Sequence, residues 1–314
     1  MSALDEGPIE THHHLLPLQA RENAIMIYGP RKAGTTLLQR LVDGSSLYVY
    51  PTELKVKQLS KATWTDKASF VEECQRTDRL MRDHVEGFDH HSFEQVTRHA
   101  AYQACSLRDA ILSKVSAAIK CSPGGDWVGW VVKEAGGDFE GILRDWKKMF
   151  ADSKLVVILR NPFFVSRSVF RKRYRTSKKL TLREVAKEVS HPWQIFKAVS
   201  AHLGRKDMHL VYYEDLVVDT EAEMRAVANF LGITFVPRLT YPTMFGEPTV
   251  VSTSTRQETA VFQARGRYWK GLGVKEIALL TLMGGAYCLM NLLTGTVTFK
   301  NGAIRLVGCP ALRG

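Results

Sequence analysis

Glycine, lysine and paired threonine residues crowd into the segment 29–36, which reads Gly-Pro-Arg-Lys-Ala-Gly-Thr-Thr and follows an apolar run at 24–28. A turn of this kind between a strand and a helix directs several backbone N–H groups and the positive end of the helix toward one point. Lys32 adds a mobile positive charge there, and Thr35 and Thr36 add hydroxyl groups. The segment therefore predicts a loop that binds a phosphate-like anion.

This loop differs from the triphosphate-binding motif Gly-x4-Gly-Lys-Ser/Thr, in which a lysine follows the second glycine. Gly29 and Gly34 have the required spacing, but Thr35 occupies the position of that lysine. A further apolar run, at 155–159, leads into Arg160, where a triphosphatase often has an aspartate for Mg²⁺. We therefore expect the loop to bind an anion without a metal ion.

Arg160 is a second candidate ligand for a phosphate group. Arginine suits this purpose because its planar guanidinium donates paired, charge-assisted hydrogen bonds. Pro162 fits the first turn of a helix, where its missing N–H is not needed. A helix that begins there would place Ser168 about two turns on, on the same flank as Arg160.

These features resemble the sulfotransferases that use 3′-phosphoadenosine-5′-phosphosulfate as donor. Residues 32–36 match the family loop that binds the 5′-phosphosulfate, with Ala33 in place of the usual serine. Arg160, followed eight residues later by Ser168, matches the pair that contacts the 3′-phosphate. The resemblance therefore implies that the loop and the pair of Arg160 and Ser168 bind two different groups of one nucleotide.

Two later stretches extend the resemblance, which covers about residues 24–293. Tyr213-Glu214-Asp215-Leu216 matches the family segment whose tyrosine lies beside the adenine, and residues 265–269 look like the basic loop that closes on the nucleotide. The residues thereby expected to bind the donor are Arg31, Lys32, Ala33, Gly34, Thr35, Thr36, Arg160, Ser168, Tyr213, Arg265, Gly266 and Arg267.

The resemblance implies an enzyme that transfers a sulfuryl group in line to a hydroxyl or amine and releases adenosine 3′,5′-bisphosphate. Lys32 is expected to neutralise the negative charge that builds on the leaving phosphate. Glu53, at the end of a short strand over 48–53, is expected to be the base, because many bacterial and Golgi-type relatives have a glutamate in a similar segment. His90 and His91 are the alternative, because other branches of the family use histidine.

The acceptor is harder to predict than the donor. Lys133 and Glu134 end another apolar strand, and they either line the acceptor pocket or form a structural ion pair. The region 55–129 carries no motif that identifies an acceptor. Small molecules, carbohydrates, peptides and lipids therefore stay open as acceptors, and the oligomeric state is equally open.

Four short apolar runs must hold these side chains in place. The runs lie at 24–28, 130–132, 155–159 and 210–213. Runs without polar alternation suit parallel strands that are covered on both faces. Thr181-x-x-Glu184 and Thr220-x-x-Glu223 resemble capping boxes that open helices between the strands. The sequence therefore predicts a single α/β domain whose mostly parallel central sheet is flanked by helices, with a P-loop-like nucleotide-binding core.

The expected domain spans residues 21–295, between an N-terminal tail at 1–20 and a C-terminal hairpin and tail at 296–314. Residues 277–299 carry no charged side chain, but helical spacing of apolar residues there favours a buried helix over a membrane span. Asn301-Gly302 is a strong hairpin signal. Membrane contact through 277–299 is the minor alternative.

Composition is consistent with a globular protein that meets anions. The chain has 314 residues, of which 45% are hydrophobic and 24% are charged, and a formal net charge of +11. These values exclude a disordered or collagen-like chain, and the positive charge favours phosphate-bearing ligands, nucleic acid or acidic membranes. Five scattered cysteines without a Cys-x-x-Cys pair fit a reducing compartment, and we expect the protein to be cytoplasmic.

Two other classes of protein compete with this interpretation. A kinase would need Mg²⁺ and ATP and would ignore a 3′-phosphate. A non-enzymatic nucleic-acid-binding protein would exploit the basic run at 171–179, in which six of nine residues are lysine or arginine. That run contains one aromatic residue, Tyr174, so it provides no platform for stacking bases. We therefore do not expect a nucleic-acid partner.

Overall fold

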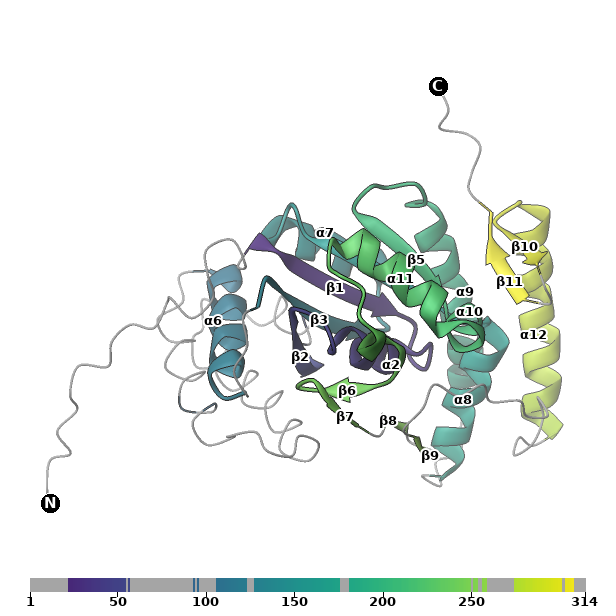
Figure 1. Ribbon diagram of the computed structural model, residues 1–314. Coiled ribbons are helices and arrows are strands. Elements are labelled where there is room, and N and C mark those ends of the chain that lie inside the picture. The colour runs from purple at the N-terminus through teal and green to yellow at the C-terminus, as the bar shows by residue number, and fades with distance from the viewer. Residues whose placement is uncertain are drawn as a thin grey trace, which may run out of the picture.

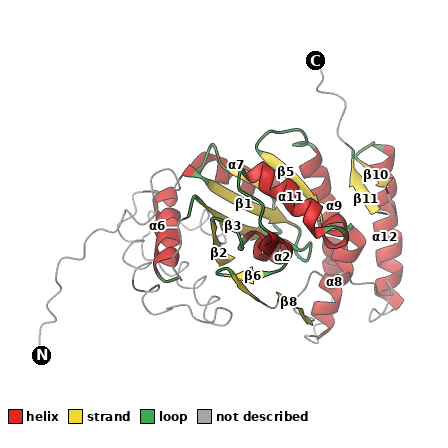
Figure 2. Ribbon diagram, viewed as in Figure 1, coloured by secondary structure: helices red, strands yellow, loops and turns green. Residues whose placement is uncertain are grey.

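The structure is a computed structural model, and it describes residues 22–54, 56, 93, 95, 106–122, 127–175, 181–249, 251–253, 256–258, 274–300 and 303–307. Within these ranges, helices surround a central sheet (Figures 1 and 2). Arg265, Gly266, Arg267, His90 and His91 lie outside the described residues, as does the tail at 1–20.

The central sheet has five strands in the order β2-β3-β1-β4-β5. The strands are β1 (Ala24–Gly29), β2 (Leu47–Glu53), β3 (Gly129–Ala135), β4 (Lys154–Leu159) and β5 (Met208–Tyr212). All four pairings between neighbouring strands are parallel. The prediction of one α/β domain built on a parallel sheet is confirmed.

Alternate residues of β1 belong to different cores, which explains the continuous apolar run. Ala24, Met26 and Tyr28 pack into one hydrophobic cluster, and Ile25 and Ile27 pack into the other. Successive side chains of a strand point to opposite faces of the sheet, so both faces here are covered.

The two faces are covered by different helices. The helices are α2 (Thr35–Val42), α6 (Leu107–Lys120), α7 (Phe139–Met149), α8 (Pro162–Arg175), α9 (Leu182–Ser200), α10 (Tyr213–Val218), α11 (Thr220–Leu231) and α12 (Val274–Leu293), with a short 3₁₀ helix, η1 (Pro237–Thr240). Buried residues of α6, α7 and α9 join the cluster that contains Tyr28, whereas those of α2, α10 and α11 join the other cluster. Helix α2 is therefore fixed by the core that it shares with α10 and α11 on one face of the sheet.

Short antiparallel strand pairs complete the described structure. They are β6 (Thr243–Met244) with β7 (Glu247–Pro248), β8 (Val251–Thr253) with β9 (Arg256–Glu258), and β10 (Val297–Lys300) with β11 (Ala303–Leu306). The last pair occupies the segment in which the sequence predicts a hairpin. The domain boundaries themselves stay a prediction.

Two helix starts differ in how well the sequence predicted them. Thr181 and Glu184 form the reciprocal capping box that the sequence predicts for α9. The predicted box at Thr220 is wrong: the N-cap of α11 is Asp219, whose carboxylate accepts a hydrogen bond from the Ala222 N–H at 3.0 Å. The Thr220 hydroxyl instead donates to the Leu216 carbonyl at 2.8 Å. Aspartate is a strong N-cap residue, so the helix starts one residue earlier than predicted.

The C-terminal helix α12 is only partly buried, which corrects the expectation of a buried helix. Leu280 is buried and Gly284 lies tightly against Phe163 of α8. On another face, Leu282, Leu289 and Leu293 are exposed. Among the helices that the structure describes, none is long and apolar enough to cross a bilayer.

Candidate functional site

The loop after β1 has the backbone geometry of an anion cradle. A Cβ atom at Gly29 would overlap the carbonyl oxygen of Ile158, so glycine allows β1 to lie close to β4 as it enters the loop. Lys32 and Gly34 both have positive φ angles, 69° and 106°, and the N–H of Ala33 donates to the Pro30 carbonyl at 3.0 Å. The chain thereby turns sharply into α2.

The N-terminus of α2 is open to an anion. Gly34 provides no side-chain cap, and no acidic residue lies in the first turn. The first N–H groups of a helix lack partners within the helix, and they carry its positive partial charge. Lys32 stands next to this end of the helix. The combination favours a negatively charged ligand over a neutral one.

Arg160 lies against this loop through two contacts. Its Nη1 donates to the carbonyl of Lys32 at 3.1 Å, and its guanidinium lies over the Tyr213 ring, 4.2 Å from the centroid. The Tyr213 ring in turn packs on Gly34, where an added Cβ would lie 2.5 Å from the tyrosine Cδ2. The structure therefore joins the loop, the end of β4 and the start of α10 at one place.

The Arg160 side chain has a further hydrogen-bond donor, its Nε–H. Its Nε is buried and has no hydrogen-bond partner among the described residues. A buried donor without a partner costs free energy unless a ligand satisfies it. This orphaned N–H fits a phosphate oxygen, because guanidinium groups bind such oxygens with charge-assisted hydrogen bonds.

Lys133 contributes to the loop from β3, which sequence reasoning did not predict. Its side chain is only 6% exposed, and its Nζ donates to the Thr36 hydroxyl at 3.0 Å. The sequence signal that could have pointed to this contact is a lysine within an otherwise apolar strand. Glu53 is the register partner of Lys133 in the parallel pair of β2 with β3. The predicted base and the loop therefore lie at the same edge of the sheet.

The neighbouring Glu134 has a structural contact. Its Oε2 accepts a hydrogen bond from the backbone N–H of Val56 at 2.9 Å. Burial, followed by the charges of Glu134 and Asp138, raises the pKa of Tyr28 well above its ordinary range. The Tyr28 hydroxyl is therefore neutral, and it donates to the carbonyl of Gly137 in the turn after β3 at 3.3 Å.

The remaining predicted residues have different surroundings. Arg31 lies on Gly136, whose added Cβ would stand 2.9 Å from the arginine Cγ. Ser168 lies in the second turn of α8 and is partly buried. No hydrogen bond between described residues ties Ser168 to Arg160. The site therefore unites the loop, Arg160 and Tyr213, and Ser168 stands on a neighbouring helix.

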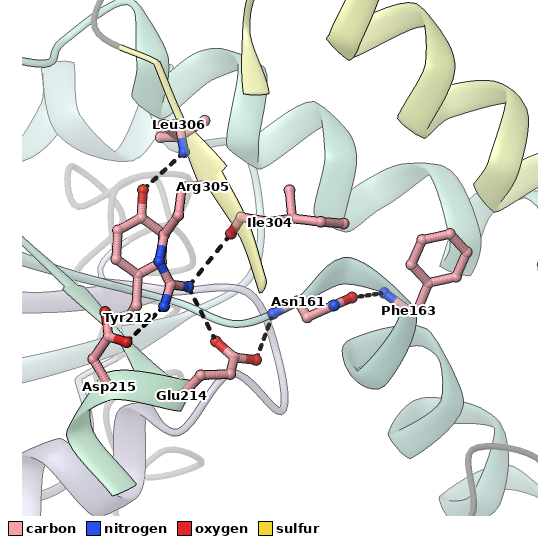
Figure 3. Close-up of polar contacts among 8 residues, drawn as sticks. All are labelled: Asn161, Phe163, Tyr212, Glu214, Asp215, Ile304, Arg305 and Leu306. Carbon is pink, nitrogen blue, oxygen red and sulfur yellow. Dashed lines mark hydrogen bonds and ion pairs between the residues drawn. The ribbon is translucent and has the colours of Figure 1, made fainter. Parts of the chain in front are cut away.

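Glu214 is a second residue that sequence reasoning did not assign a role. Its Oε1 accepts the backbone N–H of Asn161 at 2.9 Å, and the Asn161 side chain accepts the N–H of Phe163 at 3.0 Å (Figure 3). The residue after Arg160 is thereby held on both sides.

In the described part of the chain, no group of three His, Cys, Asp or Glu side chains is arranged to hold a metal ion.

A parallel α/β sheet with a glycine-containing turn at the end of its central strand is typical of proteins that bind nucleotides. Residues 24–237 match the model of a family described as "Sulfotransferase family", and the chain belongs to that family. Comparison with proteins of curated description found no match.

Solved structures that share the fold include two sulfotransferase domains. The sulfotransferase domain from the curacin biosynthetic pathway is 19% identical, with a TM-score of 0.56 over 83% of this chain and 96% of that domain. The sulfotransferase domain of the olefin synthase of Synechococcus PCC 7002 is also 19% identical, with a TM-score of 0.50 over 86% of this chain and 94% of that domain. At this identity, the two structures establish the fold alone.

Proposed function

We propose that the protein transfers the sulfuryl group of 3′-phosphoadenosine-5′-phosphosulfate to a hydroxyl or amine and releases adenosine 3′,5′-bisphosphate. Membership of the sulfotransferase family supports the reaction class. The observation that carries the choice of donor is the contact of Arg160 with Lys32. Because this hydrogen bond to the Lys32 carbonyl holds Arg160 against the loop, one nucleotide with groups on the 3′ and 5′ positions of its ribose can contact both the loop and Arg160.

The residues assigned to the donor are those that the sequence predicts. They are Arg31, Lys32, Ala33, Gly34, Thr35, Thr36, Arg160, Ser168, Tyr213, Arg265, Gly266 and Arg267. The loop and the N-terminus of α2 hold the 5′ end, and Arg160 and Ser168 hold the 3′-phosphate. The donor supplies an activated sulfuryl group whose leaving group is a phosphate.

Lys32 is assigned the role of neutralising the negative charge that builds on the leaving group. An ammonium group placed in advance stabilises that charge without having to reorganise during the reaction. Lys133 holds the Thr36 hydroxyl at 3.0 Å, which keeps a second donor of the loop in a fixed orientation. Both side chains therefore act on the same end of the donor.

Glu53 is the proposed base that takes the proton from the acceptor. It ends β2 beside Lys133, at the carboxyl edge of the sheet where the loop also begins. A base must lie within hydrogen-bond reach of the proton that it removes. His90 and His91 are the alternative bases. The acceptor is a small molecule, a carbohydrate or a peptide, and no metal ion is needed.

A transfer assay with radiolabelled donor across a panel of phenols, sugars, amines and tyrosine peptides tests this function. We expect labelled product with at least one acceptor in the presence of EDTA. Lys32→Ala should lower kcat far more than it lowers the affinity for adenosine 3′,5′-bisphosphate. Transfer of label from radiolabelled ATP in the presence of Mg²⁺, with none from the sulfuryl donor, would indicate a kinase.

The same assay tests the base. Glu53→Gln keeps the size of the side chain and removes its basicity, so it should abolish most turnover while nucleotide binding stays intact. A fully active Glu53→Gln variant would assign the role to His90 or His91.

A further inference from the structure

Arg305 of the C-terminal hairpin, which is formed by β10 and β11, lies beside residues 212–215, the segment that contains Tyr213 (Figure 3). Arg305 of β11 pairs with Asp215 through Nη2 and Oδ1 at 2.6 Å, and its Nη1 lies 4.0 Å from Oε2 of Glu214. Its guanidinium lies over the Tyr212 ring, 4.2 Å from the centroid. The backbone N–H of Leu306 donates to the Tyr212 hydroxyl at 2.8 Å.

Arg305 therefore contacts the residues on both sides of Tyr213. Tyr213 is the residue that packs on Gly34 and carries the Arg160 guanidinium. The two adjacent tyrosines each lie under an arginine, with the same 4.2 Å separation from the ring centroid. A shift of the hairpin would thus move the support of Arg160.

A second route leads from Arg305 to the same place through Glu214. Its Oε2 faces Arg305, and its Oε1 accepts the N–H of Asn161, which directly follows Arg160. The Asn161 side chain accepts the N–H of Phe163 in the first turn of α8, the helix that also carries Ser168. One carboxylate thereby connects the hairpin to both elements that are proposed to hold the 3′-phosphate.

The positive charge of Arg305 also neutralises the two carboxylates of Glu214 and Asp215. The side chains of Arg305 and Glu214 are only 11% and 22% exposed, so solvent screens their interaction less than that of an exposed pair, whereas Asp215 is 45% exposed and interacts from the surface. Without the guanidinium, Glu214 and Asp215 would leave two unneutralised negative charges beside a site for phosphate. A carboxylate that loses a partly buried partner also tends to turn toward water, which would release Asn161.

We propose that Arg305 is a positioning residue for the 3′-phosphate of the donor. It holds Glu214 on Asn161 and neutralises the acidic pair, so that Arg160 is presented to an anion with little opposing charge. Arg305 lies outside residues 24–237, the segment that matches the family. The inference rests on the proposed function, because it assigns the 3′-phosphate to Arg160.

Calorimetric titration of the full chain with adenosine 3′,5′-bisphosphate and with AMP tests the proposal, because the two nucleotides differ in the 3′-phosphate. The variants are Arg305→Gln, which removes the charge, and Arg305→Lys, which keeps it. The matched control is Arg225→Gln on α11. Arg225 also pairs with a carboxylate, Glu221, at 2.7 Å and lies over an aromatic ring, Phe235, at 4.0 Å.

We expect Arg305→Gln to weaken binding of the bisphosphate about tenfold and binding of AMP by no more than about twofold. Arg305→Lys should recover part of the loss, and Arg225→Gln should bind both nucleotides as the wild type does. If Arg305→Gln does not fold, Tyr212→Phe tests the same link. It keeps the ring and removes the acceptor of the Leu306 N–H, and it should lower the preference for the bisphosphate in the same direction.

Equal weakening of both nucleotides, or no weakening, would assign Arg305 to the structure of the hairpin alone and overturn the inference. A wild-type chain that binds AMP as tightly as the bisphosphate would overturn the proposed function, and the inference with it. The wild-type titration therefore separates the two failures.

Discussion

The anion-binding loop at 29–36 contains an unusual backbone conformation that costs free energy. Lys32 and Gly34 both have positive φ angles, a region in which residues other than glycine are strained by about 1–3 kcal/mol. Such strain persists where the surrounding contacts hold it, and here Arg160 binds the Lys32 carbonyl. The strained loop is consistent with a binding site formed before the ligand arrives.

Gly34→Ala should separate the effect of backbone strain from that of space. The new methyl group would meet the positive φ and also the Tyr213 ring at 2.5 Å. Gly204→Ala is the matched control, because Gly204 has a φ of +87° with nothing within 4 Å of an added Cβ. Chemical denaturation should show a loss of about 1 kcal/mol for the control and a larger loss for Gly34→Ala.

Nucleotide titration of the same pair extends the comparison. Gly34→Ala should weaken binding of adenosine 3′,5′-bisphosphate, because displacement of Tyr213 moves Arg160. Gly204→Ala should bind it normally. Equal effects of the two substitutions on stability and binding would show that Tyr213 does not limit the space at Gly34.

The hydrogen bond between Lys133 and Thr36 predicts coupled kinetics. Lys133→Met and Thr36→Val should each lower kcat by about tenfold, because each leaves the loop less well oriented. The double variant should be little worse than either single one, since both remove the same bond. Lys154→Met is the control: this strand lysine donates to the Leu231 carbonyl at 2.9 Å, at the amino end of β4. Losses that multiply in the double variant would mean that the two side chains act independently.

At the scale of elements, the sheet positions the site. The local sequence signals that mark the ends and the buried faces of its helices are clear for some helices and ambiguous for others. The strand, loop and helix over 24–42 could be predicted because all their signals lie within twenty residues or so of one another. The start of α11 was predicted one residue too late, since two residues that favour caps, Asp219 and Thr220, stand side by side. The exposed face of α12 was missed because a uniformly apolar helix does not reveal which side is covered.

The packing of β5 against α11 predicts a dependence of stability on pH. Burial lowers the pKa of His209 below its ordinary value of 6.5, and its ring stacks on Phe230 with centroids 5.3 Å apart. A lowered pKa means that the unfolded chain takes up a proton more readily than the folded one. His209 therefore contributes stability that is present above pH 6.5 and is lost as the pH falls through the folded-state pKa.

His209→Gln removes this titration without adding charge. The free energy of unfolding of the wild-type chain should fall more steeply between about pH 7 and pH 5 than that of the variant, by urea denaturation at each pH. Parallel curves for the two proteins would show that His209 does not carry the dependence.

At the scale of the whole molecule, one parallel sheet collects side chains from distant parts of the chain at its carboxyl edge. The residues assigned to the donor could be proposed from the sequence, because each lies in or beside a recognisable motif, and their role stays a prediction. The link from Arg305 to Asp215 could not, because it joins residues 90 positions apart and no local pattern marks it. The same holds for Lys133 and Thr36, which are 97 positions apart.

The central claim is that Lys32 and Arg160 grip opposite ends of a single nucleotide. Its most direct test is calorimetric titration of the wild-type chain and of Arg160→Gln with adenosine 3′,5′-bisphosphate and AMP, without Mg²⁺. The wild type should bind the bisphosphate at least about tenfold more tightly than AMP, and Arg160→Gln should lose that preference while still binding AMP. An Arg160→Gln variant that retains the full preference for the bisphosphate would contradict the account.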